Sequence, residues 1–424
     1  MIFLPRILNH FYTRLKSGAL QFVVFSGVLV SVLLFGAILL VYTQNLFDAK
    51  SDRLVSSLLK MEQAFFIPAE TLNKAPLEDK SSASHPYETH SDWWGLFPLI
   101  STKDSITGLS KIGLAGGYFG SKAPAIYQPD LNQRLILVGN THIDGDVSVS
   151  SQGLQRGNIG GVSFYSPQLL KGEILSSLKT LPDLHPQLLD HLKVLLKVDK
   201  YSFSAENIYT VGKQITHTFN SETRFLSHSE AIDLSGLKLT GNLVIYSPIR
   251  IIVGADTQLT DVILVAPEVT FFDRFVGSVQ VFASKKITVG THNLFKYPSV
   301  LAVVTASETA PVENLNTESE ISLGAFTDFN GVILYLNETV EESFSANVLI
   351  AEGVAVKGQV YCNKNIELQG AISGSVYTNG FIVRKNGYVY KNHLLDARVD
   401  NRLDSLFSGL VFRENRLSPA KWLY

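Results

Sequence analysis

The stretch GQVYCNKNI at residues 358–366 is followed by GSVYTNGFI at residues 374–382, and this pair decides the expected fold. Five positions of the first stretch return in the second, each after 16 residues. Such a repeat at a fixed period is typical of a chain that stacks one coil of short strands upon the next. The repeated positions are Gly358, Val360, Tyr361, Asn363 and Ile366, matched by Gly374, Val376, Tyr377, Asn379 and Ile382.

Upstream of this pair, from about residue 232, short aliphatic segments such as LVIY, IRIIV and DVILVA alternate with Gly, Pro, Asp and Asn. Hydrophobic residues make up 46% of the chain and charged residues only 17%, which favours strands joined by tight turns over helices with charged surfaces. We therefore expect a mainly β protein with a β-solenoid over residues 231–392. Inward Val and Ile side chains should stack into one hydrophobic column, with Gly and Asn at the corners.

Near the N-terminus, residues 20–42 read LQFVVFSGVLVSVLLFGAILLVY, and no charged residue lies between Lys16 and Asp48. A helix of about 20 such residues crosses a bilayer, so we predict a single transmembrane helix over 19–43. Arg6, Arg14 and Lys16 precede it, which by the positive-inside rule keeps residues 1–18 in the cytoplasm. The body is then expected outside the cytoplasm, in the periplasm of a bacterium with this helix in its inner membrane.

The junction Lys16-Ser17-Gly18-Ala19 before the apolar run resembles the processing site of type IV pilins and pseudopilins. The resemblance implies cleavage between Gly18 and Ala19 and packing of the remaining helix into a filament. At the fifth position after the glycine this chain has Val23 in place of the usual glutamate, an acid that certain minor pseudopilins also lack. Removal of the whole segment as a secretory signal is the other alternative.

The remaining regions complete the expected organisation. Residues 44–92 read as a stalk helix followed by a Pro-rich and Ser-rich linker. Residues 93–230 read as a β-rich region with an insertion of one or two amphipathic helices at 166–197. Residues 393–424 read as a helical cap and tail, because Leu394, Val399, Leu403 and Leu410 are spaced for one apolar helix face.

The repeat region resembles the bactofilins, bacterial scaffold proteins that form polymers. The residues that carry the resemblance are Gly358-Gln-Val360, Gly370-Ala-Ile372 and Gly374-Ser-Val376, with Ile366-Glu-Leu368 between them. The resemblance implies a right-handed parallel β-helix and a scaffold role. It covers about 40 residues well, and it departs from this chain in location, because bactofilins are typically cytoplasmic.

Charge and motif content argue against several function classes. The 36 basic and 38 acidic residues nearly balance, so we expect no nucleic-acid partner. The single cysteine, Cys362, has no partner for a disulfide or a thiolate metal site, and we expect it to be buried and inert. Neither His85 with His90, nor the glycines from Gly113 to Gly120, nor Asp144 with Asp146 has the spacing of a metal, dinucleotide or calcium site.

We therefore expect no enzyme activity, cofactor or metal. The first hypothesis is a membrane-anchored scaffold or envelope-assembly protein that presents its solenoid to protein partners or to further copies of itself. The second is a minor pseudopilin-like component of a secretion or pilus system. The third is a β-helix that binds or cleaves polysaccharide, for which the residues of interest are Asp256, Asp261, Asp273, Arg274, Lys285 and Lys286.

Overall fold

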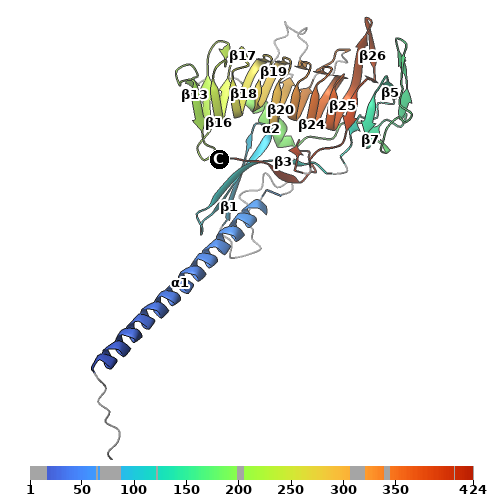
Figure 1. The fold of residues 1–424 in the computed structure, drawn as a ribbon. Coiled ribbons are helices and arrows are strands. Elements are labelled where there is room, and N and C mark those ends of the chain that lie inside the picture. The colour runs from blue at the N-terminus through green and yellow to red at the C-terminus, as the bar shows by residue number, and fades with distance from the viewer. Residues whose placement is uncertain are drawn as a thin grey trace, which may run out of the picture. The chain divides into compact units, whose positions relative to one another are not determined.

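The structure is a computed structural model, and it describes residues 17–63, 65–66, 87–120, 123–197, 205–305, 320–338, 344–404 and 406–423. The chain divides into two units, residues 1–60 and 61–424. The first holds most of one long helix, and the second is mainly β (Figure 1).

The long helix α1 spans Ser17–Gln63 and is continuous over 47 residues. Its apolar part is exposed along its whole length, and by length and composition it is apolar enough to cross a membrane. The predicted N-terminal helix is thus confirmed, and the predicted stalk up to Gln63 is its direct continuation. Residues 67–86 of the predicted linker lie outside the described residues, whereas residues 87–92 belong to a strand.

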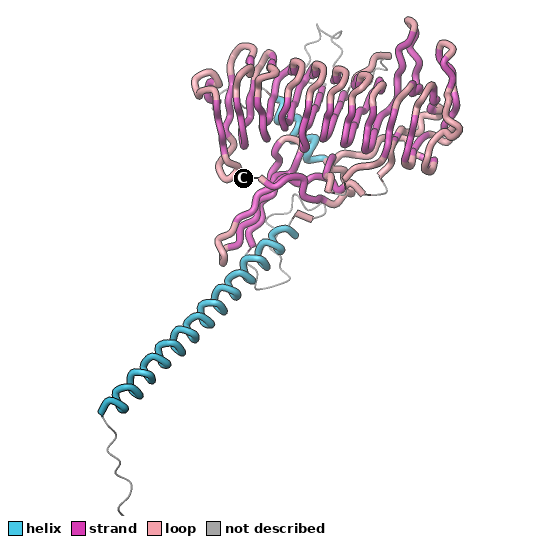
Figure 2. The backbone as a smooth tube through the Cα atoms, in the orientation of Figure 1, coloured by secondary structure: helices cyan, strands magenta, loops and turns pink. Residues whose placement is uncertain are grey.

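The main sheet of the second unit closes on itself, and all its strand pairs are parallel except β25 with β26. Figure 2 shows its strands side by side with the turns gathered along the edges. Its strands are β4 Ile126–Tyr127, β6 His142–Asp144, β7 Val147–Val149, β11 Ile174–Ser176, β12 Glu206–Asn207, β13 Gln214–His217, β14 Arg224–Ser227, β15 Ile232–Asp233, β16 Lys238–Tyr246, β17 Arg250–Val253, β18 Gln258–Phe271, β19 Val276–Val289, β20 Leu294–Thr305, β21 Glu320–Leu323, β22 Asp328–Asn337, β23 Val348–Ile350, β24 Ala355–Leu368, β25 Ala371–Lys385, β26 Tyr388–Lys391 and β28 Arg398–Asp400.

One column of core residues runs through this sheet from strand to strand, and we call it the core column. Each member pairs in register with the next, because parallel strands align equivalent positions of successive coils. The burial of aliphatic side chains in such a column is the main stabilising contribution of a stacked fold. Its members are Leu226, Ile245, Leu264, Val281, Leu301, Ile333, Val360, Val376, Ile126, Val147 and Ile174.

The order of strands in the stack differs from their order in the chain. The stack runs from β14 through β25 in chain order and then continues with β4, β7 and β11, which come earlier in the sequence. A segment that includes α2, Pro186–Leu196, leaves β11, and the chain next enters the stack at β12. The early segment thus covers the edge of β25, so the last repeat is not an open end.

A second, antiparallel sheet is built from both ends of this unit, β1 Tyr87–Trp94, β2 Phe97–Asp104, β3 Ser110–Tyr118, β29 Ser408–Gly409 and β30 Leu417–Trp422. We call it the accessory sheet. Two smaller groups complete the unit, namely β27 His393–Leu395 with β5 Leu135–Val138 and β8 Leu154–Arg156, and the hairpin β9 Asn158–Ile159 with β10 Val162–Ser163.

Two helix predictions are wrong in part or in whole. Within 166–197 only Pro186–Leu196 is helical, and Ile174 lies in β11 because its segment pairs with β7. Residues 393–424 contain no helix among those described: Leu394 and Val399 are buried from strands β27 and β28, which pair with β5 and β6. Leucines at helical spacing also suit short strands when each strand finds a parallel partner far away in sequence.

Candidate functional site

The outer face of β16, β18, β19, β20, β22, β24 and β25 is apolar and covered, although outer faces of sheets are usually polar. We call it the covered face. Its exposure is 5% or less at Tyr246, Phe282 and Leu334, which pack beneath the accessory sheet and α2. Apolar runs such as LVIY and VILVA therefore face the core with one side and the covering segments with the other. Such uninterrupted runs are typical of strands buried on both faces.

Two buried glutamines interrupt the covered face and hold the segments that lie over it. Gln280 accepts a hydrogen bond from the main-chain N–H of Leu96 at 2.8 Å. Gln359 accepts one from the main-chain N–H of Leu410 at 2.7 Å. Both glutamines are at most 3% exposed, so each bond satisfies a main-chain group that would otherwise be buried without a partner. They fix the register of the accessory sheet on the covered face.

Further polar side chains of the main sheet reach the same segments. Asn242 accepts a hydrogen bond from the indole N–H of Trp94 at 3.0 Å. The Tyr297 hydroxyl donates to the main-chain carbonyl of Ser408 at 2.8 Å, and burial raises the pKa of this phenol well above its usual value. Directional bonds of this kind select one arrangement among the many that a purely apolar contact would allow.

One ion pair anchors the last strand. The Lys421 ammonium lies 2.6 and 2.8 Å from the two carboxylate oxygens of Asp261, which also accepts a hydrogen bond from Ser278 at 3.1 Å. The Asp261 side chain is only 3% exposed and that of Lys421 28%. Asp261 has φ +55°, a conformation that Asp and Asn adopt more readily than most residues. The pair links β30 to β18.

Strand β30 also contacts the residues that follow the apolar part of α1. The Trp422 ring meets the Phe65 ring edge-on, with centroids 4.5 Å apart, and Lys111 lies 3.6 Å over the same indole. Lys111 also pairs with Glu62, while Met61 and Phe65 are buried. Glu62 and Phe65 therefore contact the accessory sheet.

The segment at 177–197 covers the other part of the face. Two tyrosines of the stack donate to its main chain, Tyr127 to Thr180 and Tyr361 to Pro182, both at 3.2 Å. Leu188, Leu192 and Leu195 of α2 pack on the face itself. Burial raises the pKa of Tyr377, which lies between Tyr127 and Tyr361 in the stack, to about 12.

The repeated residues of the sequence lie side by side in the stack. Gly358 pairs with Gly374, Val360 with Val376 and Tyr361 with Tyr377. A β-carbon on Gly358 would overlap the carbonyl of Gly331, and one on Gly374 would overlap that of Gly358, so this corner requires glycine.

The other repeated residues lie further along the same two strands. Asn379 donates to the Asn363 carbonyl at 2.8 Å. A bulge then shifts the register, so that Ile366 pairs with Phe381 instead of Ile382. Cys362 is fully buried, and burial raises the pKa of its thiol to about 12.

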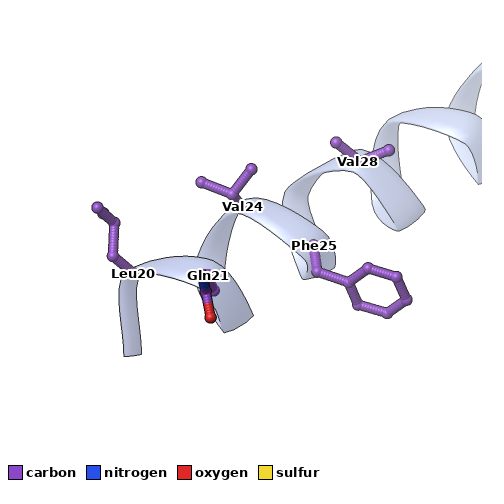
Figure 3. A pocket seen from close by; sticks show the side chains of 5 residues that line it. All are labelled: Leu20, Gln21, Val24, Phe25 and Val28. Carbon is purple, nitrogen blue, oxygen red and sulfur yellow. The ribbon is translucent and has the colours of Figure 1, made fainter. Parts of the chain in front are cut away.

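The candidate processing residues Gly18 and Ala19 lie in the first described turn of α1. Figure 3 shows the side chains that follow them, Leu20, Gln21, Val24, Phe25 and Val28, around a shallow hollow on the helix surface. Gln21 is the polar residue of this group, and none of the five is titratable. The hollow therefore provides no catalytic or metal-binding group.

Most of the described residues that the sequence offered as possible metal, dinucleotide, calcium or polysaccharide sites lie in strands or in ion pairs of the fold. Glu88 and His90 lie in β1, and His85 lies outside the described residues. The glycines at 113, 116 and 117 lie in β3, where other segments of the accessory sheet and its surroundings approach closely. Asp144 pairs with Lys171 and Arg402, and Lys286 with Glu320. No group of three metal-binding side chains occurs in the described part of the chain.

The two ends of the core column differ. At one end Leu226 is fully buried, and Glu206 of β12 is the residue stacked over it. Arg224 holds Glu206 with two hydrogen bonds of 2.9 and 2.8 Å, which lower the pKa of that carboxyl. At the other end Ile174 is 50% exposed, although Val376, Ile126 and Val147 before it are at 0%. The ion pair of Glu206 with Arg224 thus lies at the Leu226 end of the core column, whereas the Ile174 end is exposed.

Compared with known proteins, the chain matches no family model, no curated protein and no solved structure. The resemblances to bactofilins and to pseudopilins therefore rest on their short motifs alone.

Proposed function

We propose that this protein is a non-catalytic scaffold, anchored in a bacterial inner membrane by α1, whose extracytoplasmic body presents a rigid surface to protein partners. In this proposal the closed parallel sheet is a right-handed β-solenoid, the hand that nearly all parallel crossover connections adopt.

The observation that carries the proposal is the fixed attachment of the accessory sheet to the covered face. Buried Asp261 binds its strand β30, buried Gln280 binds the turn between β1 and β2, and buried Gln359 binds the residue after β29. The same sheet packs around Phe65, directly after the long helix. A body that begins at residue 61 and is held by directional bonds moves as one piece. Internal rigidity of the body is what a scaffold requires.

Labelling with a membrane-impermeant maleimide tests the location of the body. Phe326→Cys places a thiol at a residue that is 62% exposed, while native Cys362 is buried and gives little background. In intact spheroplasts Phe326→Cys should react at once, whereas His10→Cys in the basic N-terminal segment should react only after lysis. Reaction of Phe326→Cys only after lysis would reject the extracytoplasmic location.

Crosslinking in membranes of the native host then tests the scaffold role. With a short bifunctional reagent, the thiol at position 326 and thiols at other exposed positions should give adducts of discrete mass. If no exposed position of the body yields an adduct, the scaffold role is wrong, even where the labelling result is as expected.

A pseudopilin-like component is the second candidate, and the junction Lys16-Ser17-Gly18-Ala19 before the apolar run favours it. From Ser17 the described part of α1 continues unbroken to Gln63, as a helix that packs into a filament would. A processed chain would begin at Ala19, whereas a simple anchor keeps Met1. Mass spectrometry of the N-terminal peptide from membrane-extracted protein separates the two, and a Gly18→Val variant that blocks processing is the control.

A further inference from the structure

The edge strand β11 is incompletely used by the fold. It pairs with β7 on one side, and no residue-by-residue pairing joins it to another described strand. Val147 N–H donates to the Glu173 carbonyl, and Ser177 N–H donates to the Val149 carbonyl. The main-chain N–H and C=O groups of the odd-numbered residues in this segment therefore point toward β7. The N–H and C=O groups of Ile174 and Ser176 therefore point away from the stack, toward where another strand would pair.

The side chains at this edge are apolar and exposed. Ile174 is the last member of the core column and is half exposed, and Leu175 is 43% exposed. Leu178, two residues after β11, is 74% exposed. Exposed aliphatic side chains on a strand with one unpaired edge favour strand addition from another chain, a hazard that natural proteins usually prevent with charge.

The opposite end of the stack carries such charge, in the ion pair of Glu206 with Arg224. Head-to-tail addition would bring Ile174 of one copy onto Glu206 of the next and bury that carboxylate together with Arg224 against an apolar side chain. Burial of charged groups in apolar surroundings is costly, so this arrangement disfavours an open filament.

We propose that β11 pairs with β11 of a second copy across a two-fold axis, which gives a closed dimer. In the antiparallel register centred on Leu175, Ile174 faces Ser176 of the other copy and exchanges both main-chain hydrogen bonds with it. Leu175 then faces its own copy as a pair without hydrogen bonds. This register uses all the free main-chain groups of Ile174 and Ser176 and extends the core column by covering Ile174. The dimer deepens the proposed scaffold function by naming one partner.

Oxidative crosslinking of the full chain in membranes tests the dimer and its register. Opposite residues of a pair without hydrogen bonds have Cα atoms about 4.5 Å apart, within the range of about 4.4 to 6.8 Å that a disulfide spans. Leu175→Cys should give a covalent dimer within minutes of mild oxidation. Ile174→Cys should give at least about fivefold less, because its equivalent lies diagonally across the axis, about 7 Å away. Tyr209→Cys, 52% exposed in the charged end coil, should give none.

The mass of the protein in detergent gives an independent measure. The wild type should be a dimer, and Leu175→Arg should be a monomer with an unchanged circular dichroism spectrum. A monomeric wild type, a ladder of species above the dimer, or equal crosslinking at positions 175 and 209 would each overturn the proposal. Any of these results would leave the location of the body, tested by maleimide labelling at position 326, unaffected.

Discussion

Replacing Lys421 by Met should release the last strand from the main sheet, because it leaves the Asp261 carboxylate buried without its counter-charge. Breaking a fully buried pair from one side costs about 3 to 5 kcal/mol. Here Lys421 is 28% exposed, so water reaches the site, and Asp261 keeps its bond from Ser278. We therefore expect a loss of about 2 to 3 kcal/mol in the free energy of unfolding.

Urea unfolding of the full chain in detergent, followed by tryptophan fluorescence, measures this loss. Lys285→Met is the matched control, since Lys285 is exposed and should change stability by less than about 0.5 kcal/mol. The double variant Asp261→Asn with Lys421→Met should recover most of the loss, because no charge is left buried and Asn tolerates the positive φ. If Lys421→Met behaves like Lys285→Met, or the double variant is no better than the single one, the role given to this pair is wrong.

Three further predictions concern the core column and the buried titratable groups. Val376→Asp should unfold the stack around β25, since an unpaired buried carboxylate costs several kcal/mol, and a variant that still resists protease would contradict its inward position. Gly358→Ala should cost more than about 1 kcal/mol by thermal unfolding, whereas Gly120→Ala, where φ is not positive and no close contact forms, should be nearly neutral. Burial raises the pKa of Tyr377 to about 12, so folding favours the protonated phenol, and its contribution to stability should be complete below about pH 10 and fall as the pH rises toward 12. When urea unfolding is measured across this pH range, Tyr377→Phe should weaken the pH dependence of the free energy of unfolding and leave the part due to buried Tyr297.

The closed stack has a consequence for how the chain folds. Strand β4 pairs with β25 although it precedes β25 by more than 200 residues, and β7 and β11 continue the stack from β4. Contacts between such distant segments carry a large loop-closure cost and form slowly. The covered face would be exposed until both the accessory sheet and α2 are docked on it.

The sequence by itself determined the long apolar helix and the local repeat. A run of 23 residues without charge has few other stable arrangements, and the 16-residue spacing aligns Val360 with Val376 and Tyr361 with Tyr377. Both are local properties of the chain: hydropathy depends on neighbouring residues, and a fixed period aligns equivalent positions without reference to distant segments.

The tertiary structure alone decided which distant segments pair and what covers each face. Leu394 and Val399 fit a helical spacing, but parallel partners at β5 and β6 make their segments strands. Nothing near Gln359 in sequence indicates that it binds the N–H of Leu410, because that contact depends on a segment 51 positions away. The uncovered end at Ile174 is likewise invisible in the sequence, since Ile174 has the same character as the buried column members and differs only in lacking a following coil.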